Sequence, residues 1–327
     1  MSKVLGMGNA LVDIMTILDS DSLLNEFMLP KGSMQLVDRE AVERVLSGTI
    51  SLLKQQSSGG SAANTIHGLA NLGIETGFIG TVGEDEFGKF FHEDLIKNKI
   101  SPKLFKGKAE SGRAIALVSL DSERTFATFL GAAIELSSEH ITDDVFEGYE
   151  YFHIEGYLVQ NHELIRKAIE VAKRKNLKVS LDLASFNVVE SNLDFLKDII
   201  KKHVDIVFAN EEEAKAFTGL SPEESLHEIA KHCEIAVVKI GKNGSLIKKG
   251  DEVHEVGVIK AKSIDTTGAG DVYASGFLYG LVKGLPLNKC GEIGSVLSGK
   301  VIEVVGAKMD ASTWNTIREM VSEIQSS

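Results

Sequence analysis

Cysteine is scarce in this chain, and long apolar runs are missing from it. Cys233 and Cys290 are the two cysteines among 327 residues, which excludes a disulfide framework or a cysteine-rich zinc site and fits a reducing compartment. No apolar run reaches the roughly 18 residues that would span a bilayer. Acidic residues outnumber basic ones by 47 to 35, giving a net charge of −12, which argues against an extended surface for nucleic-acid phosphates. These absences predict a cytoplasmic protein with no membrane or nucleic-acid partner.

The residues that are present describe an ordinary globular protein. Apolar residues make up 43% of the chain and charged residues 25%, as in a typical folded domain. The length allows one large α/β domain or two smaller ones. From about residue 150, short β-like runs alternate with helical periods, which predicts a parallel sheet flanked by helices. The expected strands are 151–154, 179–183, 206–209 and 235–240.

A small or polar residue lies at or directly after the end of each of these expected strands. They are Glu155, Asp182, Asn210 and Gly241. Because an open parallel sheet binds its ligands at the carboxyl ends of its strands, these residues are predicted to line one edge of the sheet. That edge is the expected rim of an active site.

The first part of the chain has a different pattern, in which β-like runs are not evenly interleaved with helices. These runs are 11–18, 33–37, 114–120 and 125–130. They predict a small antiparallel sheet inserted into the main domain, where it would act as a lid that excludes water. The alternative is that they extend the main sheet. The lid is expected over 11–38 and 108–131, and the large domain over 1–10, 39–107 and 132–327.

The segment Asp265-Thr266-Thr267-Gly268-Ala269-Gly270-Asp271 carries an acid at each end and runs into a helical stretch. Gly268 and Gly270 let backbone N–H groups approach an anion, and the positive end of the following helix adds an attractive field. An acid here would repel a phosphate, which makes most sense if it takes a proton from the attacking nucleophile. Asp271 is therefore a candidate general base. A glycine-rich turn with an aspartate at a helix start is the alternative.

Two further segments carry groups suited to a hydroxylated ligand. Gly59-Gly60-Ser61-Ala62-Ala63-Asn64 opens a predicted helix, where the glycines permit close approach and Asn64 offers both a donor and an acceptor. Asn9 and Asp13 are four residues apart, which places them on one face of an extended chain as a clamp for sugar hydroxyls. A helix cap with an incidental Asn, and a surface strand, are the alternatives.

Asn210-Glu211-Glu212-Glu213 follows an expected strand at a helix start. The acids favour the helix dipole, which is a sufficient structural reason for most of them. Asn210 and Glu213 also meet on one helix face, where they would organise a magnesium ion through waters. The segment from Gly6 lacks the third glycine of a dinucleotide fingerprint, and the one from Gly241 lacks P-loop spacing, so neither of those nucleotide folds is expected.

Taken in order, these motifs resemble those of the ribokinase-like family of sugar and nucleoside kinases. The matching segments are 59–64, 83–88 (Gly-Glu-Asp-Glu-Phe-Gly), 210–213 and 265–271. Segments 8–14, 31–34, 123–125 and 130–133 look most like the adenosine-kinase-like branch. The resemblance covers essentially the whole chain. It implies a three-layer α/β/α fold with a mostly parallel central sheet and a small inserted β lid.

The resemblance also implies ATP-dependent phosphorylation of a primary hydroxyl, with Asp271 as the base. The backbone of Gly268, Ala269 and Gly270 would form the anion hole, and Arg124 would move onto the phosphates as the lid closes. The acceptor would be held by residues from both parts of the chain. These are Asn9, Leu11, Asp13, Gly60, Ser61, Asn64, Phe126, Thr128, Leu130 and Thr267.

On the donor side, the resemblance implies ATP with Mg²⁺, the ion being held through water by Asn210 and Glu213. The nucleotide-binding residues would be Asn210, Lys239, Gly241, Gly244 and Ser295. Lys239 stands where the family usually has Thr, and Ser295 where it usually has Asn. A potassium loop is implied at Asp265, Thr267, Val301 and Gly306. Lids of this family occur in monomers and dimers, so a monomer or a homodimer is expected.

Three functions are compatible with these residues. The first is a kinase of a ribonucleoside such as adenosine, which an aromatic lid residue, Phe126, favours. The second is a kinase of a free sugar such as ribose or fructose. The third is a binding protein that kept the fold without catalysis, which the intact Asp271 and its neighbouring glycines disfavour.

Overall fold

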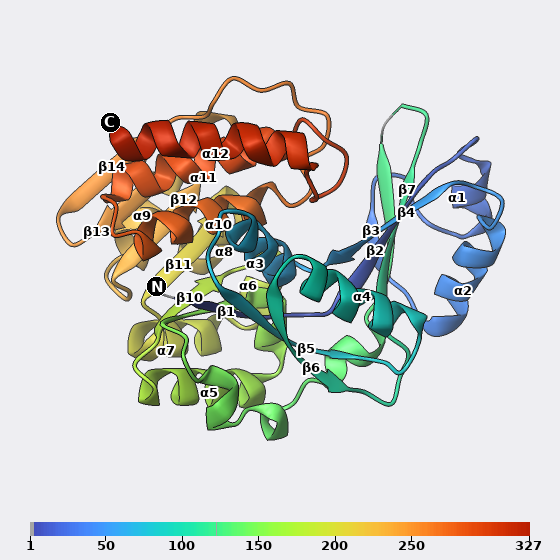
Figure 1. Cartoon of the computed structure of the whole chain (residues 1–327), viewed down its shortest axis with the longest axis horizontal. Coiled ribbons are helices and arrows are strands. Elements are labelled where there is room, and N and C mark those ends of the chain that lie inside the picture. Colours follow the sequence, from blue (N-terminus) through green and yellow to red (C-terminus); the bar gives the residue numbers. More distant parts are fainter. Residues whose placement is uncertain (1–2, 122) are drawn as a thin grey trace.

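A mostly parallel sheet forms the centre of the molecule in the computed structural model, which describes residues 3–121 and 123–327 (Figure 1). Its nine strands within that range run in the order β14-β13-β12-β11-β10-β9-β1-β5-β6. Only the β12–β13 and β13–β14 pairings among them are antiparallel. The strands are β1 (Val4–Met7), β5 (Thr76–Val82), β6 (Ile100–Lys106), β9 (Tyr151–Glu155), β10 (Lys178–Asp182), β11 (Ile206–Asn210), β12 (Ile235–Lys239), β13 (Ser245–Lys249) and β14 (Glu252–Val256). The predicted fold class is confirmed.

The central sheet separates two hydrophobic cores. On β11, Ile206 and Phe208 point into one core, whereas Val207 and Ala209 point into the other, because successive strand side chains face opposite sides. The first core includes α3 (Ser61–Asn71), α4 (Glu86–Lys97), α10 (Ala269–Val282), α11 (Leu287–Val301) and α12 (Ala311–Ser326). The second includes α5 (His162–Arg174), α6 (Phe186–Ser191), α7 (Leu193–His203), α8 (Glu211–Thr218) and α9 (Pro222–Ile229). These helices make the outer two layers.

Short turns of 3₁₀ helix fill several connections between these elements. They are η1 (Gly131–Glu135), η2 (Ser138–His140), η3 (Asp143–Phe146), η4 (Gly156–Gln160) and η5 (Gly241–Asn243). No helix within residues 3–121 and 123–327 has the length and apolarity needed to cross a bilayer. Residues 1 and 2, which the expected large domain includes, lie outside the described part of the chain.

A second, five-stranded sheet stands beside the main body with the order β3-β8-β7-β2-β4 (Figure 1). Its strands are β2 (Leu11–Ile17), β3 (Met34–Leu36), β4 (Lys54–Gly59), β7 (Gly112–Val118) and β8 (Arg124–Phe129). β4 was not predicted. The expectation of an antiparallel sheet is also wrong in part, since β2 pairs with β7 and β3 with β8 in parallel. Long connections separate the strands of both pairs, and such crossovers allow a strand to return in the same direction.

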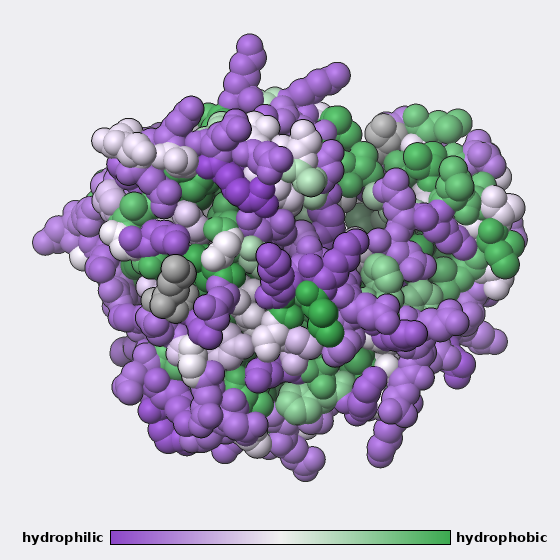
Figure 2. Space-filling view, in the orientation of Figure 1, coloured by the Kyte–Doolittle hydropathy of each residue, from purple (hydrophilic) through white to green (hydrophobic). Residues whose placement is uncertain are grey.

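The two faces of the second sheet have different surroundings. Val12 and Ile14 pack into the first core together with residues of α1 (Ser22–Glu26) and α2 (Arg39–Gly48). Leu11 and Asp13 alternate with them and therefore face the opposite way, toward the main body. Figure 2 shows the surface hollowed between the main body and the lobe that the second sheet forms. Alternation along β2 thus sends one acid and one apolar side chain toward this hollow.

Helices α10 and α11 approach closely enough that glycine is required between them. A Cβ on Gly276 would lie 2.7 Å from the backbone of Ile293 and Gly294 on α11. This close contact holds the middle of α10 against α11 and thereby helps to fix the direction of its N-terminal end.

Gly276→Ala is expected to lower the free energy of unfolding by about 1–3 kcal/mol, because the added methyl group meets backbone that cannot rotate away. Gly257→Ala is the matched control, since a Cβ there would meet nothing within 4 Å, and it should change stability by less than about 0.5 kcal/mol. Urea unfolding of the two variants measures the difference. Equal stability of both would contradict the account of this helix contact.

Candidate active site

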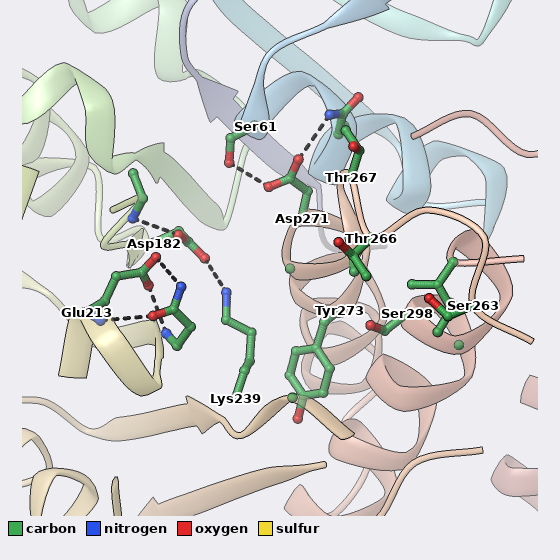
Figure 3. A pocket seen from close by; sticks show the side chains of 18 of the residues that line it. Ser61, Asp182, Glu213, Lys239, Ser263, Thr266, Thr267, Asp271, Tyr273 and Ser298 are labelled. Carbon is green, nitrogen blue, oxygen red and sulfur yellow. Dashed lines mark hydrogen bonds and ion pairs between the residues drawn. The ribbon is translucent and has the colours of Figure 1, made fainter. Parts of the chain in front are cut away.

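A cavity of about 950 Å³ opens at the carboxyl ends of the main-sheet strands and reaches the second sheet at Asp13, Ala114 and Phe126. We call it the main cavity. Figure 3 shows side chains that line it, among them Asp182, Lys239 and Asp271. Many of the predicted site residues line it together: Asp13, Gly60, Ser61, Asn64, Phe126, Asn210, Glu213, Lys239, Gly241, Gly244, Thr267, Ala269, Gly270, Asp271 and Ser295. The structure therefore brings together residues from near both ends of the sequence, from Asp13 to Ser295.

The N-terminal end of α10 points into the main cavity. Gly268 is its N-cap with φ of 75°, in the left-handed region that favours glycine. A side chain at Gly268 would also meet the Cβ of Ala307, at 2.5 Å. Gly270 and Asp271 lie in the first turn of α10, whose N–H groups have no partner within the helix. These groups and the helix dipole can bind an anion, as the sequence predicts.

The Asp271 carboxylate is held by two side chains of α3. Ser61 Oγ donates to its Oδ1 at 2.8 Å, and Asn64 Nδ2 donates to its Oδ2 at 3.0 Å. Burial raises the pKa of Asp271, while the hydrogen bond from Asn64 opposes that shift. Ser61 and Asn64, expected to bind the acceptor, therefore also orient the candidate base.

The two glycines before α3 make room for neighbouring groups. A Cβ on Gly59 would overlap the Asp13 carboxylate, and one on Gly60 would overlap the Asn9 carbonyl oxygen. Gly60 has φ of 97° and is the N-cap of α3, a conformation that glycine adopts readily. The Gly-Gly pair is thus needed for local packing as well as for close approach of a ligand.

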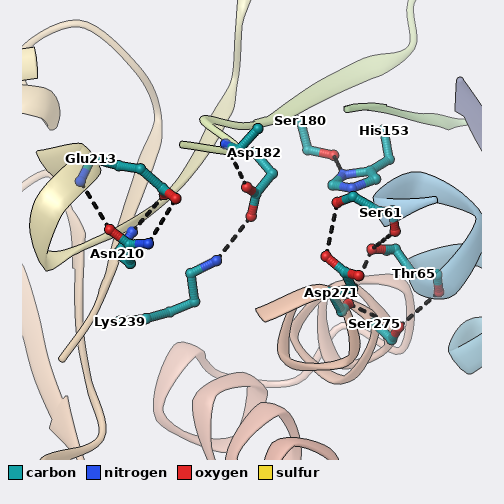
Figure 4. A network of polar contacts seen from close by, with 11 residues as sticks. Ser61, Thr65, His153, Ser180, Asp182, Asn210, Glu213, Lys239, Asp271 and Ser275 are labelled. Atoms are coloured by element: carbon teal, nitrogen blue, oxygen red, sulfur yellow. Dashed lines mark hydrogen bonds and ion pairs between the residues drawn. The ribbon is translucent and has the colours of Figure 1, made fainter. Parts of the chain in front are cut away.

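A buried ion pair lies across the main cavity from Asp271 (Figure 4). Lys239 Nζ lies 2.9 Å from Asp182 Oδ2, and their side chains are 15% and 8% exposed. Lys239 ends β12 and Asp182 ends β10, so both reach the same sheet edge. Burial disfavours the ammonium, but Asp182 and Glu213 outweigh it, and the pKa of Lys239 is raised. A permanent positive charge therefore faces the anion-binding end of α10.

Asn210 and Glu213 meet as a reciprocal cap of α8. Asn210 Oδ1 accepts from the Glu213 backbone N–H at 2.9 Å. The Glu213 carboxylate in turn accepts from the Asn210 backbone N–H and side-chain amide at 2.8 and 2.7 Å. Burial, followed by repulsion from Asp182, raises the pKa of Glu213 to about 7. The pair is brought together as predicted, with its polar atoms largely bonded to each other.

These residues fit a magnesium ion held through water. Both carboxylate oxygens of Glu213 are engaged by Asn210, while Asp182, Glu211 and Glu212 also line the main cavity. In the described part of the chain, no group of three or more His, Cys, Asp or Glu is arranged to hold a metal directly. Acidic side chains that face a cavity without direct ligation suit an ion that keeps several of its waters.

Arg124, at the start of β8, bridges the second sheet and the turn before α10. It forms an ion pair with Asp265, and its Nη1 donates to Thr267 Oγ1 at 3.2 Å. Asp265 also accepts from the backbone N–H groups of Thr267 and Gly306, at 2.9 and 2.6 Å. The guanidinium thus neutralises the carboxylate expected at the potassium loop.

One carbonyl of that expected loop, that of Val301, is also engaged. The Val301 carbonyl accepts from the backbone N–H of Val304 at 3.1 Å. Because Asp265 is paired with Arg124, the residues of this loop do not present a free carboxylate for potassium. The potassium loop stays a prediction.

A second cavity of about 1170 Å³, the lid cavity, lies against the second sheet and adjoins the main cavity at Gly60, Ser61, Ala114 and Tyr157. The predicted residues Asn9, Leu11, Thr128 and Leu130 line it. Its walls include the apolar side chains of Met34, Leu36, Leu130 and Leu136 and the amides of Gln160, Asn161, Asn187 and Asn192. An apolar chamber with a few polar groups in its wall suits an organic ligand that has a flat apolar body and polar edges.

Asn9 and Asp13 do not form the expected clamp. Asn9 precedes β2, and its side-chain amide donates to Glu155 Oε1 at 2.6 Å. Asp13 lies within β2 and lines the main cavity, where Asn9 is not part of the wall. The reason is that extended backbone begins at Leu11, so strand alternation does not relate the two residues.

Three residues at the cavities were given no role of their own from the sequence, although Glu155 was expected at the rim. Glu155 accepts from Asn9 and from the Ala62 N–H at 3.1 Å, and burial raises its pKa to about 7. Tyr157 lines both cavities, and Lys308 lines a smaller one beside Asp13. The strand end at Glu155 was a usable signal, whereas nothing around Tyr157 or Lys308 distinguishes them in the sequence.

The chain matches the model of the pfkB family of carbohydrate kinases over residues 52–314. It is 30% identical to a nucleoside kinase of Methanocaldococcus jannaschii, over 81% of this chain and 85% of that protein. Among solved structures, it is similar to a probable sugar kinase of Rhizobium etli with a TM-score of 0.87 and 34% identity, over 98% of each chain. An adenosine kinase of Sinorhizobium meliloti gives a TM-score of 0.86 and 33% identity, over 98% of this chain and 99% of that one.

The fold, the site and these similarities define a phosphotransferase whose acceptor is a sugar or a nucleoside and whose family uses ATP as a substrate. The chain belongs to the pfkB family of carbohydrate kinases. The sequence-based assignment to sugar and nucleoside kinases of ribokinase-like fold, on the adenosine-kinase-like side, is confirmed.

Asp13→Asn is expected to raise the free energy of unfolding by about 1–3 kcal/mol at pH 8.5 and by less at pH 5.5. Burial, opposed by Lys308, raises the pKa of Asp13 from 3.8 to about 7. The unfolded chain therefore releases this proton before the folded chain does. The resulting cost to stability begins near pH 4, grows as the pH rises, and is complete above about pH 7.

Urea unfolding at the two pH values measures this effect, with the exposed Asp251→Asn as the control. An equal gain in the free energy of unfolding at both pH values, or a loss at pH 8.5, would show that burial of the Asp13 carboxylate does not destabilise the fold in this way.

Proposed function

We propose that this chain is an ATP-dependent nucleoside kinase that phosphorylates the primary hydroxyl of a ribonucleoside, with Asp271 as the general base. The observation that carries the proposal is the position of Asp271. It lies in the first turn of α10, at the wall of the main cavity, and its carboxylate is oriented by Ser61. Ser61 also lines the lid cavity, so the base stands where the contents of the two cavities meet.

The residues of this chain would act on the proton and on the transferred phosphoryl group. Asp271 takes the proton of the acceptor hydroxyl as its oxygen attacks the γ-phosphorus of ATP, and the bond to the β-phosphate oxygen breaks to release ADP. The N–H groups at the start of α10 stabilise the charge that gathers on the phosphoryl oxygens. The raised pKa of Asp271 makes it a better proton acceptor than an exposed carboxylate.

The main cavity would hold the nucleotide. Lys239 supplies a positive charge beside the phosphates, and it lies close enough to α10 that a Cβ on Gly270 would be 3.0 Å from its Nζ. Gly241 and Gly244 line the cavity with positive φ values of 54° and 100°, and Ser295 lines it from α11. When bound, magnesium held through water by Asn210 and Glu213 would neutralise charge on the donor phosphates.

The second sheet would act as the lid over the acceptor. Its open face presents Leu11, Phe126 and Thr128 to the cavities, and Arg124 already joins it to the turn before α10. On β8 alternation directs Phe126 to the cavity, whereas Phe129 stacks beside the Arg113 guanidinium, 5.2 Å from its ring centre. Closure of this sheet would keep water from the γ-phosphate.

Size and polarity of the lid cavity favour a nucleoside as the acceptor. At about 1170 Å³ it is far larger than a pentose needs, and its apolar walls suit a flat base. Similarity to the adenosine kinase of Sinorhizobium meliloti over nearly the whole chain supports the same choice. A free sugar is the second candidate, favoured by the similarity to the probable sugar kinase of Rhizobium etli.

Asp271→Asn is expected to lower kcat by about 10²–10⁴-fold while leaving the affinity for acceptor and ATP nearly unchanged, because it removes the base and little volume. A coupled ADP-release assay measures kcat, and calorimetric titration measures binding. Asp251→Asn, on the exposed surface, is the matched control. Turnover retained by Asp271→Asn would rule out the assigned base.

Adenosine and other ribonucleosides are expected to be phosphorylated with a kcat/KM at least about tenfold above that of ribose or fructose, since the apolar walls of the lid cavity would contact a base that free sugars lack. One panel of adenosine, inosine, guanosine, cytidine, ribose and fructose with ATP and magnesium measures this. Turnover of free sugars alone would replace the nucleoside assignment with the sugar kinase.

A further inference from the structure

A small cavity of about 160 Å³ lies between the second sheet and the turn that precedes α12. Asp13 and Phe126 line both this cavity and the main cavity, so the two cavities meet beside Asp13, one of the residues expected from the sequence to bind the acceptor. Lys308 lines it from the turn, and Arg124 lines it from β8. The cations of Lys308 and Arg124 and the carboxylate of Asp13 therefore line a cavity that is large enough for only a few hydroxyl groups.

The Lys308 ammonium has no hydrogen-bond partner among the described residues, although its Nζ is buried. Burial lowers the pKa of Lys308 to about 8, against the attraction of Asp94, Asp13 and Asp271. A buried ammonium without a partner is costly, and folding alone gives no reason to place it there. Lys308 therefore lacks a partner that a ligand can supply.

Two hydrogen-bond acceptors near Lys308, Asn64 Oδ1 and the Asp13 carboxylate, also lack a partner in the described part of the chain. Asn64 Oδ1 is buried without a hydrogen bond, while the amide nitrogen of the same side chain is used on Asp271. No hydrogen bond to the Asp13 carboxylate occurs within residues 3–121 and 123–327. Two donors, Lys308 Nζ and Arg124 Nε, and two acceptors, Asn64 Oδ1 and the Asp13 carboxylate, thus lack partners among the residues described, and they belong to residues that line the small cavity, the main cavity or both.

The charges at this junction favour a neutral ligand group over an anion. Asp94, Asp13 and Asp271 all act on Lys308, and the guanidinium of Arg124 is already paired with Asp265. A phosphate or carboxylate would meet these acids with one free cation to compensate it. A hydroxyl group has both a proton to donate and lone pairs to accept with, which matches the unpartnered groups.

We propose that Lys308 is a further acceptor-binding residue, whose ammonium donates to the oxygen of a sugar hydroxyl while that hydroxyl donates to Asp13. Lys308 and Asp13 would together bind the neutral 2′- or 3′-hydroxyl group of the proposed nucleoside. This inference rests on the proposed function and deepens it. It makes Lys308 a specificity-determining residue that discriminates against deoxy acceptors.

The test compares wild type with Lys308→Met, which keeps the length of the side chain and removes the donor. Adenosine, 2′-deoxyadenosine and 3′-deoxyadenosine are the acceptors, with ATP held saturating. For adenosine, KM should rise at least about tenfold, as expected for loss of a hydrogen bond to a charged group. The KM for ATP should change less than about twofold. Toward at least one deoxy analogue, the variant and wild type should have nearly the same kcat/KM, because the partner hydroxyl is already missing.

Two further variants separate this role from a structural one. Lys308→Arg keeps a cationic donor and should restore part of the preference for adenosine over the deoxy analogue. Lys89→Met, on an exposed side chain of α4, should leave every constant unchanged. A fall in kcat/KM by the same factor for adenosine and both deoxy analogues would overturn the inference, as would an unchanged KM in Lys308→Met.

Failure of the proposed function gives a different result. If wild type phosphorylates free sugars but no nucleoside, the nucleoside assignment fails, and the same comparison with ribose and its 2-deoxy and 3-deoxy forms tests Lys308. Equal losses for ribose and both deoxy sugars would then overturn the inference on Lys308. Wild type that phosphorylates neither class would overturn both proposals.

Discussion

The contact between α3 and α10 is the constraint on which the site depends. Ser61 and Asn64 on α3 hold the carboxylate of Asp271 on α10, and Ser275 Oγ on α10 donates to the Thr65 carbonyl at 2.7 Å. These bonds join two helices that are about 200 residues apart in the chain. Because α10 also carries the anion-binding N–H groups, one helix contact sets the position of the base and the phosphate site together.

Much of the fold could be predicted, since its evidence is local. The main strands after residue 150 follow from short apolar runs bounded by polar residues, and each lies within one or two residues of its expected place. β4 was missed because Lys54–Gly59 is polar and has no alternation that marks a strand. The direction of pairing in the second sheet depends on crossovers between distant segments, which no local pattern reports.

The candidate site was predictable where a motif has a backbone requirement, as at Gly268 and Gly60. Partners across the fold were not. Lys239 meets Asp182 because the strands that they terminate, β12 and β10, end at the same edge of the sheet. Arg124 meets Asp265 because the second sheet approaches the turn before α10. Lys308 is the clearest case, since a buried and unpartnered ammonium is a property of its surroundings and has no sequence signature.

The ion pair of Arg124 with Asp265 has a consequence for how a ligand is received. It ties the second sheet to the turn before α10 through the protein's own side chains. The approach of the two sheets is therefore established as the chain folds, and a ligand does not have to supply the whole entropic cost of ordering them. Movement of the second sheet away from this turn would require the buried pair to separate, so a wider opening of the chamber costs free energy.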